Sequence, residues 1–191
     1  MRPRFILLGG PNGSGKSSLV NRIEPTGLDD IINPDTIRQE DGSLASQLQA
    51  GRIVIQRTAK NFAAGRGFLL ETTLSGKRES RVVAEARDRG YRVEVMFVCL
   101  RDVELNIMRV QSRVRLGGHF VPEEDIRRRY FRSLDNLREI LPLTNAAVLF
   151  DNSGKGHVEV AKFEEGRLIW RTESGPGWLG LVLDDESEKK N

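Results

Sequence analysis

Short apolar runs alternate with longer amphipathic segments along most of the chain. The runs read as buried strands, and the segments between them repeat apolar residues at helical spacing. The predicted strands are 5–8, 30–33, 68–72, 92–100 and 146–150. The predicted helices are 16–23, 36–39 and on through 44–64, 77–89, 103–115, and one that begins at Pro122. This alternation predicts an α/β fold with a parallel sheet and right-handed crossovers.

The pattern changes after residue 153. The stretch GHVEVAKFEEGRLIWRT alternates apolar and polar positions on both sides of Glu165-Gly166, which predicts a β-hairpin. We therefore expect one main domain over 1–153 and a hairpin extension of the same domain over 154–183, with SGPGW as a loop. The charged end DDESEKKN, residues 184–191, has the composition of a disordered tail.

The stretch GGPNGSGKSS, Gly9 to Ser18, follows the first predicted strand and opens the first predicted helix. It contains G-x-x-x-x-G-K-[ST] in full, the loop whose backbone N–H groups surround a phosphate. In this setting Lys16 reaches the β- and γ-phosphates of a nucleotide, and the Ser17 hydroxyl holds Mg²⁺. The expected nucleotide-binding residues are Gly10, Pro11, Asn12, Gly13, Ser14, Gly15, Lys16, Ser17 and Ser18.

Asp35 stands in NPDTIR, directly after the second predicted strand. Ligands of parallel sheets bind at the carboxyl ends of the strands, so this carboxylate is expected to face the γ-phosphate. There it can accept a proton from a substrate hydroxyl. Arg38 is expected on the neighbouring helix face, where it can bind an anionic substrate. The alternative is that Asp35 only caps the helix that begins at Thr36.

Glu71, Thr72 and Thr73 end the third predicted strand. P-loop proteins usually carry an acidic residue after a second strand to orient Mg²⁺. Glu71 or Asp35, or water, must take that role. We place Glu71 and Thr72 among the candidate substrate-binding residues, against the alternative that Glu71 is an exposed strand end.

The segment RVQSRVRLGGHFVPEEDIRRRYFRSLDNL, 109–137, holds two arginine-bearing helices around a Gly-Gly pair. It is typical of a lid, at about 109–132, that closes over a phosphoryl donor and neutralises the transferring charge. Among its arginines we favour Arg113 and Arg128, with Arg129 at the flank of the apolar stripe. His119, beside the glycines, is a candidate substrate-binding residue. The alternative is a solvated helical hairpin whose arginines pair with its acids.

Composition adds limits to this picture. A net charge of +3 does not demand a nucleic-acid partner. The single cysteine, Cys99, excludes an internal disulfide and a cysteine-based zinc site, and its apolar neighbours predict a buried thiol. No apolar run approaches the roughly 20 residues that span a bilayer. The expected location is cytoplasmic, without a membrane partner.

Together these segments resemble the zeta-toxin-like kinases, a branch of the P-loop kinases. The matching residues are GGPNGSGKSS, NPDTIR, ETT, the 109–137 stretch and DNS at 151–153, so the resemblance covers about 4–153. It implies a P-loop nucleotide-kinase-like sheet with flanking helices and a helical lid. It also implies ATP and Mg²⁺ as cofactors, with Lys16 on phosphate, Asp35 as base and lid arginines on the transferring phosphoryl group.

For the toxin members, the resemblance implies phosphorylation of the amino sugar of UDP-N-acetylglucosamine. The Gly-Gly-His lid looks like that of a chromosomal bacterial branch, which leaves the acceptor and an antitoxin partner open. The leading hypothesis is an ATP-dependent kinase for a small-molecule hydroxyl. The alternatives are an NTP-binding switch, although no N-K-x-D guanine segment occurs, and a kinase acting on nucleic-acid ends.

Overall fold

The computed structural model describes residues 2–20, 23, 26–40, 47–118 and 120–183. A single sheet runs through them in the order β2-β3-β1-β4-β5-β6-β7. The strands are β1 (Arg4–Gly9), β2 (Asp30–Ile32), β3 (Phe68–Thr72), β4 (Arg92–Cys99), β5 (Ala146–Asp151), β6 (Val158–Glu164) and β7 (Arg167–Arg171). β2, β3, β1, β4 and β5 pair in parallel, so the α/β prediction is confirmed.

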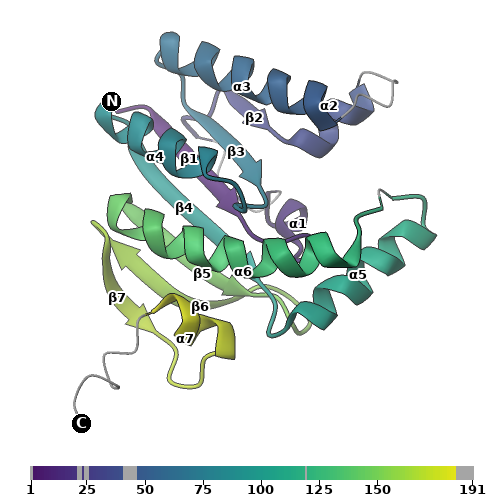
Figure 1. Cartoon of the computed structure of the whole chain (residues 1–191). Coiled ribbons are helices and arrows are strands. Elements are labelled where there is room, and N and C mark those ends of the chain that lie inside the picture. The colour runs from purple at the N-terminus through teal and green to yellow at the C-terminus, as the bar shows by residue number, and fades with distance from the viewer. Residues whose placement is uncertain (1, 21–22, 24–25, 41–46, 119, 184–191) are drawn as a thin grey trace.

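The helices are α1 (Lys16–Val20), α2 (Pro34–Glu40), α3 (Gln47–Ala63), α4 (Arg78–Asp88), α5 (Val103–Arg115), α6 (Glu123–Ile140) and α7 (Gly177–Val182). Most of the core lies on one face of the sheet, where α3, α4, α6 and α7 cover alternate residues of the central strands. Figure 1 shows α3, α4 and α6 crossing that face. A smaller cluster on the opposite face packs Ile6 and Leu8 against Leu19 of α1.

The hairpin extends the sheet: β6 pairs antiparallel with β5, and β7 pairs with β6. Its two-residue turn places Glu165 at φ 46° and Gly166 at φ 74°, the conformation that suits a tight hairpin between twisted strands. The expected tail at 184–191 lies outside the described residues.

The loop prediction for SGPGW is wrong in its second half, because α7 begins at Gly177. Tertiary packing explains this helix. Trp178 is buried against Phe97 of β4, with ring centroids 6.0 Å apart, and its indole nitrogen donates to Asp151 at 3.1 Å. The contacts of Trp178 therefore hold this short helix in position, and the local sequence pattern does not predict them.

Candidate active site

Residues 10–15 connect β1 to α1 and form a loop that curls around the Lys16 side chain. The Lys16 ammonium donates to the carbonyl oxygens of Gly10 (2.7 Å) and Pro11 (3.1 Å). Gly10 has φ 145°, and a Cβ there would lie 2.1 Å from the Val98 carbonyl oxygen, so only glycine fits. Burial lowers the pKa of Lys16, and the nearby Glu71 and Asp35 carboxylates oppose that shift. The loop thus holds a buried cation ready for an anionic ligand.

Two side chains from the segment between β5 and β6 hydrogen-bond to the same loop. Asn152 donates to the Ser14 carbonyl oxygen at 2.8 Å, and His157 Nε2 lies 3.1 Å from the Gly15 carbonyl oxygen. A Cβ at Gly15 would lie 2.3 Å from the Asn152 amide nitrogen, so the contact requires glycine. The sequence signal for the Asn152 contact was weak: it was the DNS segment, 151–153, at the carboxyl end of a predicted strand.

Glu71 lies beside the Ser17 hydroxyl. Ser17 donates to Glu71 Oε1 at 3.0 Å, and the Asn33 amide donates to Oε2 at 2.9 Å. Glu71 is only 5% exposed, which contradicts the reading of an exposed strand end. Burial raises its pKa, while Lys16 and the Ser17 hydrogen bond act in the opposite direction. The sequence placed Glu71 among the candidates both for substrate binding and for orienting Mg²⁺, and its contact with Ser17 favours the second role.

The pair of oxygens from Ser17 and Glu71 fits a magnesium ion. Magnesium in phosphoryl-transfer sites takes one or two protein oxygens and completes its shell with phosphates and water. Across the residues that the structure describes, no three His, Cys, Asp or Glu side chains gather into a metal site of their own. The donor set therefore suits an ion that arrives with a nucleotide.

Asp35 is exposed and lines the same cavity as Lys16 and Ser17. The helix begins two residues earlier than expected, at Pro34, and Asn33 takes the capping position: its side-chain oxygen accepts from the Asp35 backbone N–H at 2.8 Å. The alternative that Asp35 caps the helix is therefore wrong. Because Asn33 makes the capping contact, the Asp35 carboxylate is not needed for it, and Asp35 lines the cavity. The Arg38 side chain lies outside the described residues.

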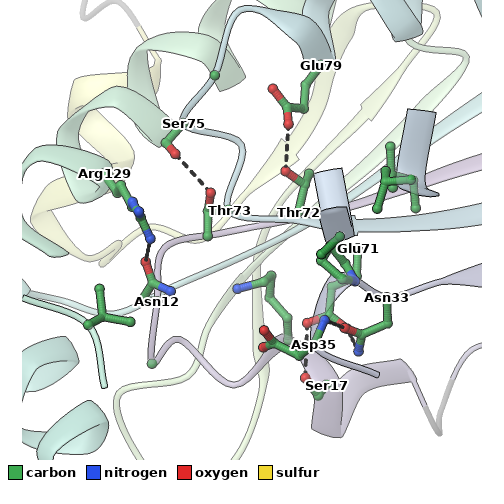
Figure 2. Close-up of a pocket in the computed structure, with 18 of the residues that line it drawn as sticks. Asn12, Ser17, Asn33, Asp35, Glu71, Thr72, Thr73, Ser75, Glu79 and Arg129 are labelled. Atoms are coloured by element: carbon green, nitrogen blue, oxygen red, sulfur yellow. Dashed lines mark hydrogen bonds between the residues drawn. The ribbon is translucent and has the colours of Figure 1, made fainter. Parts of the chain in front are cut away.

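Helices α5 and α6 bring Arg109, Arg113 and Arg129 to the cavity. Arg109 of α5 donates to the Asn152 carbonyl oxygen at 2.8 Å, and Arg129 of α6 donates to the Asn12 side-chain oxygen at 3.3 Å. Figure 2 shows this contact between Arg129 and Asn12 of the 10–15 loop. His119 lies outside the described residues.

Arg128, which the sequence favoured, does not line the cavity. Its side chain is 54% exposed and pairs with Asp125 one turn earlier on α6. The reason is the direction of the apolar stripe on α6. Tyr130 and Ile126 are buried, so Arg129, at the flank of the stripe, contacts Asn12 of the 10–15 loop. Arg128 points away from it.

All these groups border one cavity of about 660 Å³. Figure 2 shows Ser17 and Asp35 on one side of it and Thr72, Thr73, Ser75 and Glu79 on the other. Thr72 lies there as expected, with its hydroxyl donating to Glu79 at 2.9 Å. An anion-binding loop, a magnesium-compatible oxygen pair, an exposed carboxylate and three arginines thus share one space.

The Zeta toxin family model matches residues 1–158. The chain belongs to the Zeta toxin family. A protein of Haemophilus influenzae described as uncharacterized is 30% identical over 133 residues, which make up 68% of this chain and 94% of that protein. The fold and family of the present chain are those of P-loop phosphotransferases.

Two solved structures share the fold of this zeta-toxin family protein. The AvrRxo1-ORF1:ORF2 complex with ATP has a TM-score of 0.70 at 16% identity over 95% of this chain. The chain spans 64% of that AvrRxo1 chain. The PezAT chromosomal toxin-antitoxin system of Streptococcus pneumoniae has a TM-score of 0.62 at 20% identity, over 94% of this chain and 77% of the other. Within the described ranges, no helix has both the length and the apolar character to cross a bilayer.

Proposed function

We propose that this protein transfers the γ-phosphoryl group of ATP to a hydroxyl of a small molecule, with the amino sugar of UDP-N-acetylglucosamine as the candidate acceptor. The observation that carries the proposal is Asp35, an exposed carboxylate in the cavity that Lys16 and Ser17 also line. A switch protein needs no proton acceptor there, whereas a kinase uses one to receive the hydroxyl proton.

On this proposal, the loop amides and Lys16 bind the β- and γ-phosphates. Ser17 and Glu71 would hold magnesium, which would supply neutralisation of phosphate charge. Asp35 orients the acceptor hydroxyl and receives its proton as the hydroxyl oxygen bonds to the γ-phosphorus, while the bond to the β–γ bridging oxygen breaks and ADP leaves. Arg113 and Arg129, with Arg109, offset the negative charge that spreads over the transferring group and exclude water.

The test is a transfer assay with γ-labelled ATP and Mg²⁺. UDP-N-acetylglucosamine is offered beside a panel of sugars, nucleosides and 5′-hydroxyl oligonucleotides. Lys16→Ala and Asp35→Asn are each expected to lower transfer about 10²-fold or more, with unchanged thermal unfolding, because each removes one catalytic contribution. Asp135→Asn, an exposed carboxylate on α6 outside the cavity, is the matched control.

Several outcomes decide between the functions. Full transfer by Asp35→Asn to every accepted substrate would show that Asp35 is not the base. Label on oligonucleotides, with affinity that falls steeply with salt, would favour the nucleic-acid-end kinase. Bound ATP with no labelled acceptor in the panel would favour the switch.

A further inference from the structure

The segment between β5 and β6 holds the 10–15 loop without bordering the cavity. Asn152 donates to the Ser14 carbonyl oxygen, and His157 Nε2 lies 3.1 Å from the Gly15 carbonyl oxygen. A carbonyl oxygen can only accept, so the second contact places the proton of the His157 ring on Nε2. Neither Asn152 nor His157 lines the cavity, whereas Gly15 does. The two side chains therefore act on the loop itself rather than on a molecule in the cavity.

Each of these contacts fixes the direction of one peptide unit. In a trans peptide unit, the C=O of one residue and the N–H of the next point in opposite directions. The carbonyl that Asn152 holds shares its unit with the Gly15 N–H, and the carbonyl that His157 holds shares its unit with the Lys16 N–H. Gly15 and Lys16 both line the cavity, so these two N–H groups point toward it. Successive N–H groups that converge in this way bind phosphate.

Helix α5 holds a third peptide unit in the same manner. Asn106 is fully buried, does not line the cavity, and donates to the Asn12 carbonyl oxygen at 2.6 Å. The N–H of that unit belongs to Gly13, which lines the cavity. Gly13 and Gly15 have φ 78° and 93°, left-handed conformations that occur where backbone N–H groups form a concave site for an anion. The loop is thus held by side chains from two distant parts of the chain.

The segment that carries Asn152 is itself fixed by contacts of its backbone and its neighbour. The Asn152 N–H donates to the Cys99 carbonyl oxygen at 3.0 Å, and the Asn152 carbonyl oxygen accepts from Arg109 at 2.8 Å. Asp151 accepts from the indole N–H of Trp178, a buried side chain of α7. Helix α7 lies beyond the part of the chain that the family model matches. The extension therefore contributes to the position of a residue that holds the 10–15 loop.

We propose that Asn152 and His157 are positioning residues for ATP, which orient the N–H groups of Gly15 and Lys16 before the nucleotide binds. The segment thereby raises the affinity for the phosphates without touching them. Donors that are already oriented lose little freedom when the ligand binds. A hydrogen bond to the carbonyl also polarises its peptide unit and strengthens the N–H as a donor. This inference rests on the proposed function, because it concerns the nucleotide donor of that reaction.

The test measures binding without turnover. Tripolyphosphate, which has the phosphates but no nucleoside, and a non-hydrolysable ATP analogue are titrated calorimetrically in the presence of Mg²⁺. Asn152→Ala and His157→Phe are each expected to weaken both probes by the same factor, about 3-fold to 10-fold, since each variant loses one hydrogen bond to the loop. Equal factors for the two probes locate the effect at the phosphates.

Matched variants separate positioning from general stability. Asn145, directly before β5, accepts from the Val93 N–H at 2.9 Å and does not line the cavity. Asn145→Ala should therefore unfold at a lower temperature but bind both probes like the wild type. His157→Phe keeps a ring for the edge-on contact with Phe150. His157→Gln keeps an N–H donor and should recover part of the affinity that His157→Phe loses.

The inference is overturned if the wild type does not bind tripolyphosphate, or if Asn152→Ala and His157→Phe bind it like the wild type. It is also overturned if only the ATP analogue weakens, because the segment would then contact the nucleoside. An equal loss of affinity in Asn145→Ala would assign the effect to stability. The proposed function fails separately: Asn152-dependent binding without label transfer to any acceptor would keep the positioning role and reject the kinase. Transfer by a protein in which Asn152→Ala binds normally would do the reverse.

Discussion

Replacing Gly51 with alanine should make the protein more stable and should narrow the cavity where α3 lines it. Gly51 is the fifth residue of α3, and alanine is favoured over glycine in a helix interior by about 0.8–1.0 kcal/mol. A Cβ there meets no atom within 4 Å, so no clash offsets that gain. For a chain of this size, the expected rise in melting temperature is about 2–4 °C.

The assay pairs thermal unfolding with transfer kinetics on the accepted substrate. Gly180→Ala in α7, where a Cβ also meets nothing within 4 Å and which lies outside the cavity, is the control for the helix effect alone. Gly51→Leu should raise the acceptor KM about 10-fold or more and leave the ATP KM unchanged, since a pocket contact is typically worth about 1–3 kcal/mol. A lower melting temperature for Gly51→Ala, or an unchanged acceptor KM for Gly51→Leu, would refute the reasoning.

Two further predictions concern the phosphate end of the cavity. Burial raises the pKa of Glu71 above 4.5, so Mg²⁺-dependent binding of an ATP analogue should weaken as the pH falls toward that raised pKa from about pH 8, and Glu71→Gln should bind weakly without this pH dependence. Titrations with Mg²⁺ across the pH range measure this, and an identical pH profile in the variant would remove Glu71 from the magnesium site. Arg129→Gln should lower kcat about 10²-fold, while Arg128→Gln, which loses the same charge outside the cavity, should act like the wild type. Equal losses in the two variants would show that only the net charge of the lid matters.

The local sequence was sufficient where a single segment forms a complete unit. The phosphate loop is such a unit, because its glycines, Lys16 and Ser17 are adjacent in the chain and their conformation follows from local backbone geometry. The alternation of strands and helices could be predicted for a similar reason, because the spacing of apolar residues along a segment indicates which of its faces is buried. The hairpin turn could also be predicted, because the Glu165-Gly166 pair and the alternating residues beside it are local signals.

Side-chain direction could not be predicted in the same way. Arg128 and Arg129 are neighbours in one arginine run, and the choice between them depends on how α6 rotates when Tyr130 packs into the core. The sequence left Glu71 open between substrate binding and magnesium, and only the fold shows its contact with Ser17, a residue 54 positions earlier in the chain. The helix α7 likewise depends on the contact of Trp178 with Phe97.

The sequence by itself determined the phosphate loop, the α/β class and the carboxylate at residue 35, because each is encoded within a few consecutive residues. Only the tertiary structure decided which arginines line the cavity, which residue caps α2, and that Glu79 lies across the cavity from Asp35. The physical reason is that a site is made of contacts between distant segments, and their geometry is fixed by packing of the whole core rather than by local preference.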